Sequence, residues 1–177
     1  MKKVILMLFM IAGFAVGVNA QAPEGFQFGA GIRAGLPVGD FGDTHSFGIG
    51  GELQGEYGFS KNFSGIITSG FTHFFGKTET IGSITVEYEG VGLIPVIAGL
   101  RYYPSNNIFL GAQAGVGILT GNGDSEAGFN WQPQVGFSTE HFQVALNYNG
   151  LTKDGSTLGH IGLTGIFKFG GGGSAKK

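Results

Sequence analysis

Residues 90–120 constrain the fold most, because they form two alternating segments joined by the turn sequence Pro-Ser-Asn-Asn. Apolar side chains occupy every second position of both arms: Ile94, Val96, Ala98, Leu100 and Tyr102, then Ile108, Leu110, Ala112, Ala114, Val116 and Ile118. The positions between them hold mainly glycine and polar residues, such as Gly99, Arg101 and Gln113. This pattern is typical of a strand that has lipid on one side and a narrow polar lumen on the other.

The same alternation recurs along the chain and gives eight predicted strands. They cover 26–36, 46–59, 63–75, the two arms of 90–120, 127–137, 142–149 and 158–169. All five charged side chains of these segments fall on the inward faces: Arg33, Glu52, Glu56, Arg101 and Lys168. A lysine or arginine facing the middle of a bilayer costs about 2–4 kcal/mol, whereas a soluble lipocalin-type barrel has an apolar interior. The sequence therefore predicts an all-β fold, an eight-stranded antiparallel up-and-down transmembrane β-barrel.

The first twenty residues predict a signal peptide. Lys2 and Lys3 precede an apolar stretch, and Val18-Asn19-Ala20 supplies a cleavage site. We expect residues 21–169 to form the barrel domain and 170–177 to be a flexible tail. The chain has no cysteine, and its net charge of −2 gives no indication of a nucleic-acid partner. The longest apolar run, 91–100, is half of the roughly 20 residues that a spanning helix needs.

The connections indicate which end of the barrel faces the periplasm. They are short after the second, fourth and sixth strands, and longer after the other strands, at 37–45, 76–89, 121–126 and 151–157. With short turns and both termini in the periplasm, the longer loops face outward. Residues 83–88 have strand character, so strands three and four are expected to continue beyond the membrane as a ribbon. Aromatic residues predict an interface girdle at the periplasmic ends: Tyr57, Phe59, Phe63, Tyr102, Phe137, Phe142 and Phe169. Pro95 and Pro133 predict bulges or broken ladder bonds.

Several of these segments resemble a known family. The signal, the GIRAGLPVGDFGD start, the SFGIGGELQGEYGFSKNFS hairpin and the IPVIAGLRYYP stretch are similar to the small outer-membrane β-barrel (porin-like) family, including OmpX and the membrane domain of OmpA. The resemblance covers 26–169. It implies location in the outer membrane, contact with outer-membrane lipids and insertion by the barrel-assembly machinery, which reads alternating aromatics in the last strand. Phe167 and Phe169 resemble that signal.

The inward charges suggest a structural site. Arg33, Glu52, Glu56, Arg101 and Lys168 are predicted to form a lumen ion network with Gln54, Gln113, Asn130 and Gln134, because eight strands leave an interior that side chains fill. A conducting channel is the alternative. No catalytic, cofactor-binding or metal-binding residue is predicted.

Three further patterns have the residue types of a functional site but not its spacing or context. The glycines at 29–35 lack the strand–helix context of a nucleotide loop. Asp40, Asp43 and His45, and likewise Asp124 and Glu126, lack metal-site spacing. His73 with Ser69, or His160 with Thr164, would share a strand face but has no third orienting group.

The sequence thus favours a monomeric, non-enzymatic barrel with a structural or surface-interaction role. Loops 37–45 and 76–89 are the expected contacts for a surface ligand, and edge-strand addition to the ribbon is one route. The alternatives are a narrow porin-like channel for small solutes and an enzyme that acts on lipids.

Overall fold

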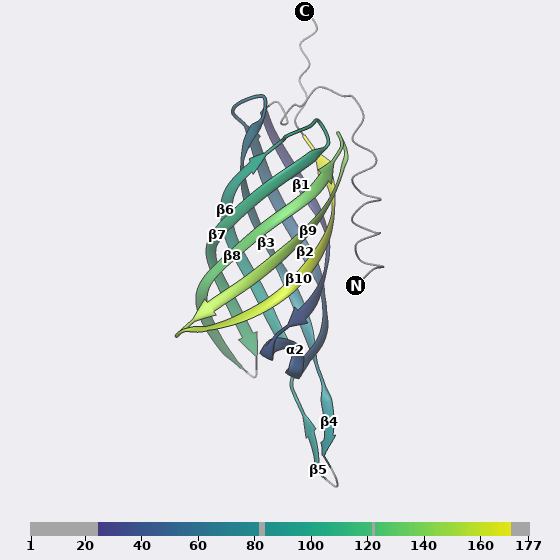
Figure 1. Ribbon diagram of the computed structural model, residues 1–177, viewed down its shortest axis with the longest axis vertical. Helices are drawn as coiled ribbons and strands as arrows, with labels where there is room; N and C mark the ends of the chain where they lie inside the picture. Colours follow the sequence, from purple (N-terminus) through teal and green to yellow (C-terminus); the bar gives the residue numbers. More distant parts are fainter. Residues whose placement is uncertain (1–24, 82–83, 122, 171–177) are drawn as a thin grey trace, which may run out of the picture.

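The computed structural model describes residues 25–81, 84–121 and 123–170. The predicted signal peptide and the tail beyond Gly170 lie outside the described residues. Eight strands of 12 to 15 residues form a closed antiparallel barrel in the order β1-β10-β9-β8-β7-β6-β3-β2. The barrel strands are β1 (Gly25–Val38), β2 (His45–Gly58), β3 (Phe63–Gly76), β6 (Val91–Tyr102), β7 (Ile108–Gly121), β8 (Asp124–Ser138), β9 (Phe142–Lys153) and β10 (Ser156–Phe169). The predicted fold class is confirmed, and Figure 1 shows the tilted strands of the barrel.

Two further strands and one short helix lie outside the barrel wall. Strands β4 (Thr78–Ile81) and β5 (Ile84–Glu87) pair with each other in a separate two-stranded sheet. This ribbon projects beyond the barrel, as the strand character of 83–88 predicted (Figure 1). Helix α2 (Asp40–Thr44) lies between β1 and β2. In the described part of the chain, no helix is long and apolar enough to cross a membrane.

The two faces of the barrel wall follow the alternation in the sequence. Large apolar side chains are exposed on the outside, as for Ile32 at 72% and Leu53 at 62%. The charged side chains of the barrel strands divide into two sets. Arg33, Glu52, Glu56, Arg101 and Lys168 are buried inside, and Asp124, Glu126 and Lys153 lie at strand ends. An outer wall without charge between its ends is compatible with lipid.

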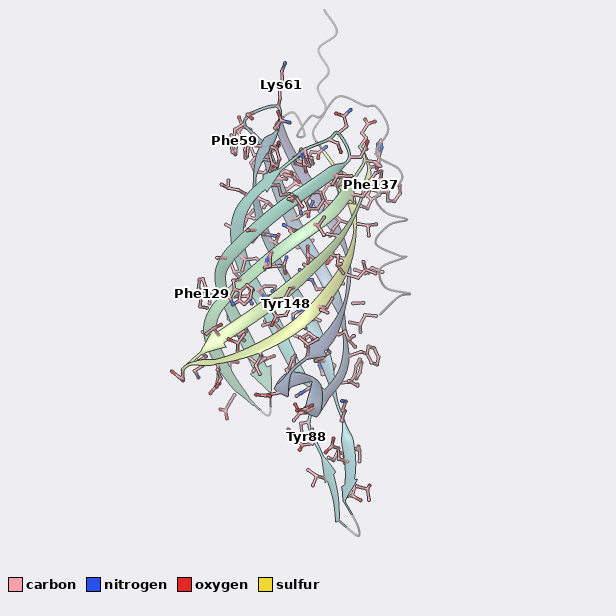
Figure 2. The ribbon with its side chains drawn as sticks, viewed as in Figure 1. Phe59, Lys61, Tyr88, Phe129, Phe137 and Tyr148 are labelled. Carbon is pink, nitrogen blue, oxygen red and sulfur yellow. The ribbon has the colours of Figure 1, made fainter. Side chains whose placement is uncertain are left out.

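Aromatic side chains lie on the outer wall near both ends. Figure 2 shows Phe59 and Phe137 near one end of the barrel and Phe129 nearer the other. All seven residues of the predicted girdle are at least 42% exposed. Neighbouring rings contact one another, with ring centres 5.1 Å apart for Phe63 and Tyr102 and 5.2 Å apart for Trp131 and Tyr148. Aromatic side chains at this position suit the interface between lipid and water.

The two ends of the barrel differ. We call the end with the connections 59–62, 103–107 and 139–141 the turn end, and the end with α2 and the ribbon the loop end. Two predicted loops at the loop end are wrong. β7 and β8 continue to Gly121 and from Asp124, and β9 and β10 are joined only by Asp154 and Gly155. The reason is that polar residues outside the membrane still pair as strands, and Asp154-Gly155, with φ of 48° and 83°, forms a tight hairpin turn.

The two strand prolines interrupt pairing, as predicted. The β3–β6 ladder is interrupted between the pairs Ser69–Val96 and Thr72–Leu93, and the gap includes Pro95. The β8–β9 ladder is interrupted between the pairs Trp131–Gly150 and Gln134–Asn147, and that gap includes Pro133. The register is the same on both sides of each gap, because a missing N–H removes ladder bonds without adding a residue.

Candidate functional site

The lumen near the turn end is organised around Arg101. Because Leu100 and Tyr102 face outward, β6 turns Arg101 into the barrel, where it is 1% exposed. Its guanidinium donates to four side chains on β2, β8 and β9: Glu56 (2.6 Å), Gln143 (2.8 Å), Gln54 (3.3 Å) and Gln134 (3.3 Å). The Arg101 guanidinium also lies 4.2 Å from the centre of the Phe109 ring on β7. One side chain therefore reaches across the lumen to four other strands.

Glu56 is the acceptor at the centre of this group. Its Oε1 accepts hydrogen bonds of 2.5 Å from the hydroxyls of Ser64 and Tyr103, and its Oε2 pairs with Arg101 at 2.6 Å. Tyr103 lies just beyond the end of β6. Burial, and then the charge of Glu56, raises the pKa of Tyr103, so its hydroxyl keeps the proton that it donates. The carboxylate thus accepts hydrogen bonds from one cationic donor and two neutral hydroxyls, in a site buried from solvent.

A second group lies further toward the loop end. Arg33 on β1 forms an ion pair with Glu52 on β2, and donates to Gln132 on β8 at 3.1 Å. Asn149 donates to the same Gln132 oxygen (3.1 Å) and exchanges hydrogen bonds with Asn130 (2.8 and 3.1 Å). This group also crosses the lumen, because it joins β1 and β2 to β8 and β9.

Lys168 is separate from both ion pairs. Its Nζ donates to Ser138 Oγ (2.8 Å) and Gln27 Oε1 (3.4 Å), and among the described residues it forms no salt bridge. The structure therefore places all five charged residues that the sequence singled out inside the lumen, but as two ion pairs and one lysine bonded to neutral oxygens. Of the expected polar partners, Gln54, Gln134 and Asn130 take part, while both side-chain polar atoms of Gln113 have no partner in the described structure.

Several lumen residues were missed by the sequence analysis. Gln143 and Asn149 alternate with the apolar residues of 142–149, and this alternation was the available signal that they face inward. Tyr103 and Ser64 had no such signal, because Tyr103 lies next to the turn Pro-Ser-Asn-Asn, where the alternation ends, and inward apolar residues such as Phe74 interrupt the alternation of 63–75.

A layer of apolar side chains lies at the loop end of the lumen. Phe41 on α2 and Phe74 on β3 are in ring contact (5.0 Å), and they pack in one buried cluster with Leu93 and Leu151. The loop predicted at 37–45 is thus partly helical, and α2 exists because Phe41 can bury its ring at the barrel mouth. Phe74 also packs edge-on against His160 at 4.9 Å. Phe74, an apolar residue on the inward face of 63–75, therefore has a structural role.

The candidate reactive and metal-binding groups are dispersed. In the residues that the structure describes, no group of three or more His, Cys, Asp or Glu is placed to hold a metal ion. His45 contacts Thr44 Oγ1 at 2.8 Å, and Phe41 at 4.7 Å. His160 is 1% exposed, and Thr164 accepts a hydrogen bond from Asn147.

A hollow of about 250 Å³ lies at the loop end, at the base of the ribbon. It is lined by Glu89, Gly90, Val91, Leu119, Gly121, Asp124 and Glu126. Val91 and Leu119 are only partly buried, and they pack against the apolar layer below. The hollow is therefore open outward, with an apolar floor and carboxylates at its edge. Tyr88 directly precedes Glu89 of this lining, and Figure 2 shows it where the ribbon joins the barrel.

Comparison with known proteins gives solved structures only. No protein-family model and no curated protein matches the chain. The crystal structure of Ail, the attachment invasion locus protein of Yersinia pestis, matches with a TM-score of 0.55 at 16% identity, covering 82% of this chain and 99% of Ail. Ail in a phospholipid bilayer nanodisc gives 0.58 at 16% identity, with 82% and 100% covered. The outer membrane protein OprG from Pseudomonas aeruginosa gives 0.50 at 14% identity, with 85% and 99% covered.

At these identities the likeness concerns the fold. The fold predicted from the resemblance to small outer-membrane barrels is confirmed: a closed eight-stranded barrel like those of Ail and OprG. A closed barrel leaves no unpaired strand edge in lipid, and its charge-free outer wall matches the hydrocarbon layer. The protein is an integral barrel of the outer membrane.

Proposed function

We propose that this protein is a monomeric, non-enzymatic barrel with a structural or surface-interaction role, and that side chains plug its lumen. Outer-membrane lipids surround its wall, and the barrel-assembly machinery inserts it. The observation that carries the proposal is the reach of Arg101 across the lumen to β2, β8 and β9. A solute would have to break these bonds and leave Glu56 buried without its cation.

Two further layers support a closed lumen. The group around Arg33 and Gln132 crosses the barrel a second time, and the layer of Phe41 and Phe74 lies at the loop end. An eight-stranded barrel has an interior just wide enough for side chains to fill. A narrow porin-like channel is the competing proposal, because polar atoms without partners, such as those of Gln113, would suit water in the lumen.

Single-channel recording in planar lipid bilayers separates the two. We expect the purified protein to give no discrete conductance steps, and the double variant Arg101→Ala/Glu56→Ala to give them or to raise the leak. Regular steps with the unmodified protein would show a porin and overturn the plugged lumen.

The absence of enzymatic activity is supported by where the histidines lie. His160 is buried against Phe74, out of reach of a lipid chain, and in the described part of the chain no side-chain hydrogen bond joins Ser69 or His73 to an orienting group. We expect mass spectra of lipid A to be identical in cells with and without the protein. A change in acylation that is lost in the His73→Ala variant would overturn this part of the proposal.

The loop end is the proposed contact surface, with segments 37–45 and 76–89 as its main parts. Ail has been solved in complex with the heparin analogue sucrose octasulfate, a polyanion. The loop end of the present chain does not suit such a ligand. The segments 37–45, 76–89, 121–126 and 151–157 hold eight carboxylates and two lysines: Asp40, Asp43, Glu79, Glu87, Glu89, Asp124, Glu126 and Asp154, with Lys77 and Lys153. We propose that a surface ligand of this protein is cationic instead.

A further inference from the structure

The hollow at the base of the ribbon suits one kind of side chain. Its floor is aliphatic, formed by Val91 and Leu119, and its edge carries Glu89, Asp124 and Glu126. A volume of about 250 Å³ is several times the roughly 30 Å³ of one water molecule. Lysine and arginine combine an aliphatic stem with a charged end, so their stem would cover the floor while their charge meets the carboxylates.

The carboxylates at this edge are not all engaged within the protein. Glu126 pairs with Lys153 at 3.0 Å, and both side chains are exposed. Glu89 and Asp124 form no salt bridge among the described residues. An incoming cation would therefore meet two carboxylates that carry no counter-charge.

A free strand edge lies directly beside the hollow. Among the described residues β5 pairs only with β4, and it leads through Glu89 into β6, which pairs with β7. The unpaired edge of β5 is therefore on the side of β7 and β8, whose ends Gly121 and Asp124 line the hollow. An unpaired edge offers backbone N–H and C=O groups to an extended peptide.

We propose that the loop end binds an extended basic peptide segment, which adds as a strand to the free edge of β5 and places a lysine or arginine side chain in the hollow. This inference rests on the surface-interaction role proposed above and names the chemistry of the partner. A second copy of the chain fits less well, because pairing two ribbons would bring Glu79 and Glu87 of both copies together, and like charges on neighbouring strands repel.

The experiment uses the full barrel, folded in phospholipid nanodiscs, and synthetic ten-residue peptides. The first peptide alternates lysine and threonine, the second alternates glutamate and threonine, and the third is the lysine peptide with alternate backbone nitrogens methylated. Fluorescence anisotropy of the labelled peptides gives the affinity, at low salt and at 0.5 M NaCl.

Binding of the lysine peptide only, weakened by salt and by backbone methylation, is the expected result. The double variant Glu89→Gln/Asp124→Asn should lower the affinity by about tenfold, which corresponds to two exposed ion pairs. The matched control Asp154→Asn removes a loop-end charge at the β9–β10 turn, which is not among the residues lining the hollow, and should change the affinity by less than about twofold.

Three results would overturn the inference. Equal binding of the methylated peptide would exclude strand addition, and equal loss in Asp154→Asn would exclude the hollow. Concentration-dependent dimerisation through the ribbon, without peptide binding, would identify a second copy as the occupant. A porin-like conductance of the same nanodisc preparation, after transfer to planar bilayers, would overturn the plugged lumen independently of the peptide result.

Discussion

Replacing the buried Arg101 guanidinium, by Arg101→Met, should destabilise the barrel more than breaking an exposed ion pair does. The guanidinium and its partner Glu56 are each 1% exposed, and four hydrogen bonds depend on Arg101. Breaking a buried ion pair at one partner costs about 3–5 kcal/mol, because a charge stays buried without compensation. Ser64 and Tyr103 would still donate to Glu56, so we expect a loss near the lower limit, about 3 kcal/mol in the free energy of unfolding.

The assay is urea unfolding of the barrel in phospholipid vesicles, followed by the fluorescence of Trp131, the single tryptophan. A double-mutant cycle with Glu56→Gln should show a coupling of about 1.5 kcal/mol or more, since the double variant no longer buries an unpaired charge. Lys153→Met is the matched control. It breaks the exposed pair with Glu126 and should cost at most about 1 kcal/mol. Equal losses for Arg101→Met and Lys153→Met, or a coupling near zero, would refute the reasoning.

Three further changes test other parts of the structure. Leu53→Arg faces an ion into the lipid and should cost about 2–4 kcal/mol in vesicle unfolding, whereas Phe59→Arg in a turn should cost less than about 1 kcal/mol; similar costs would mean that Leu53 does not face lipid. Gly31→Ala should impair folding, because the new Cβ would lie 1.9 Å from the Gly165 carbonyl oxygen. In Gly165→Ala the new Cβ meets nothing within 4 Å, so this control should give the same fraction of folded protein as the unmodified chain on a cold SDS gel. Equal folding of the two variants would contradict the close strand approach. Burial raises the pKa of Tyr103, so the stability that its protonated hydroxyl supplies is present below about pH 10 and is lost as the pH rises further. The urea midpoint should therefore fall more steeply above pH 10 in the unmodified protein than in Tyr103→Phe. Parallel pH profiles of the two proteins would contradict this.

The sequence allowed the barrel wall to be predicted almost completely. A strand in lipid must alternate, so Ile32 and Leu53 could be placed outside and Arg101 inside from spacing alone. The prolines were also placed correctly at interruptions of the ladders.

The ends of the strands and the pairing inside the lumen could not be predicted in this way. Outside the membrane the alternation no longer depends on lipid, so the polar strand ends near Asp124 and Lys153 were read as loops. Inside the barrel, spacing shows which side chains enter the lumen, but not their position along the barrel axis or the direction in which they point across it. That Arg33 pairs with Glu52, and Arg101 with Glu56, depends on strand register and tilt. Helix α2 has only five residues, too few for a periodic signal.

The most direct test of the central claim is the migration of unheated and boiled protein on an SDS gel, using the outer-membrane fraction. A closed barrel, in which every strand pairs with a neighbour on both sides, should resist cold SDS and migrate at a different apparent mass after boiling. We expect this shift, in the membrane fraction, for the unmodified protein. Soluble protein without any shift would contradict the account, and the faces assigned to lipid and lumen would then be wrong.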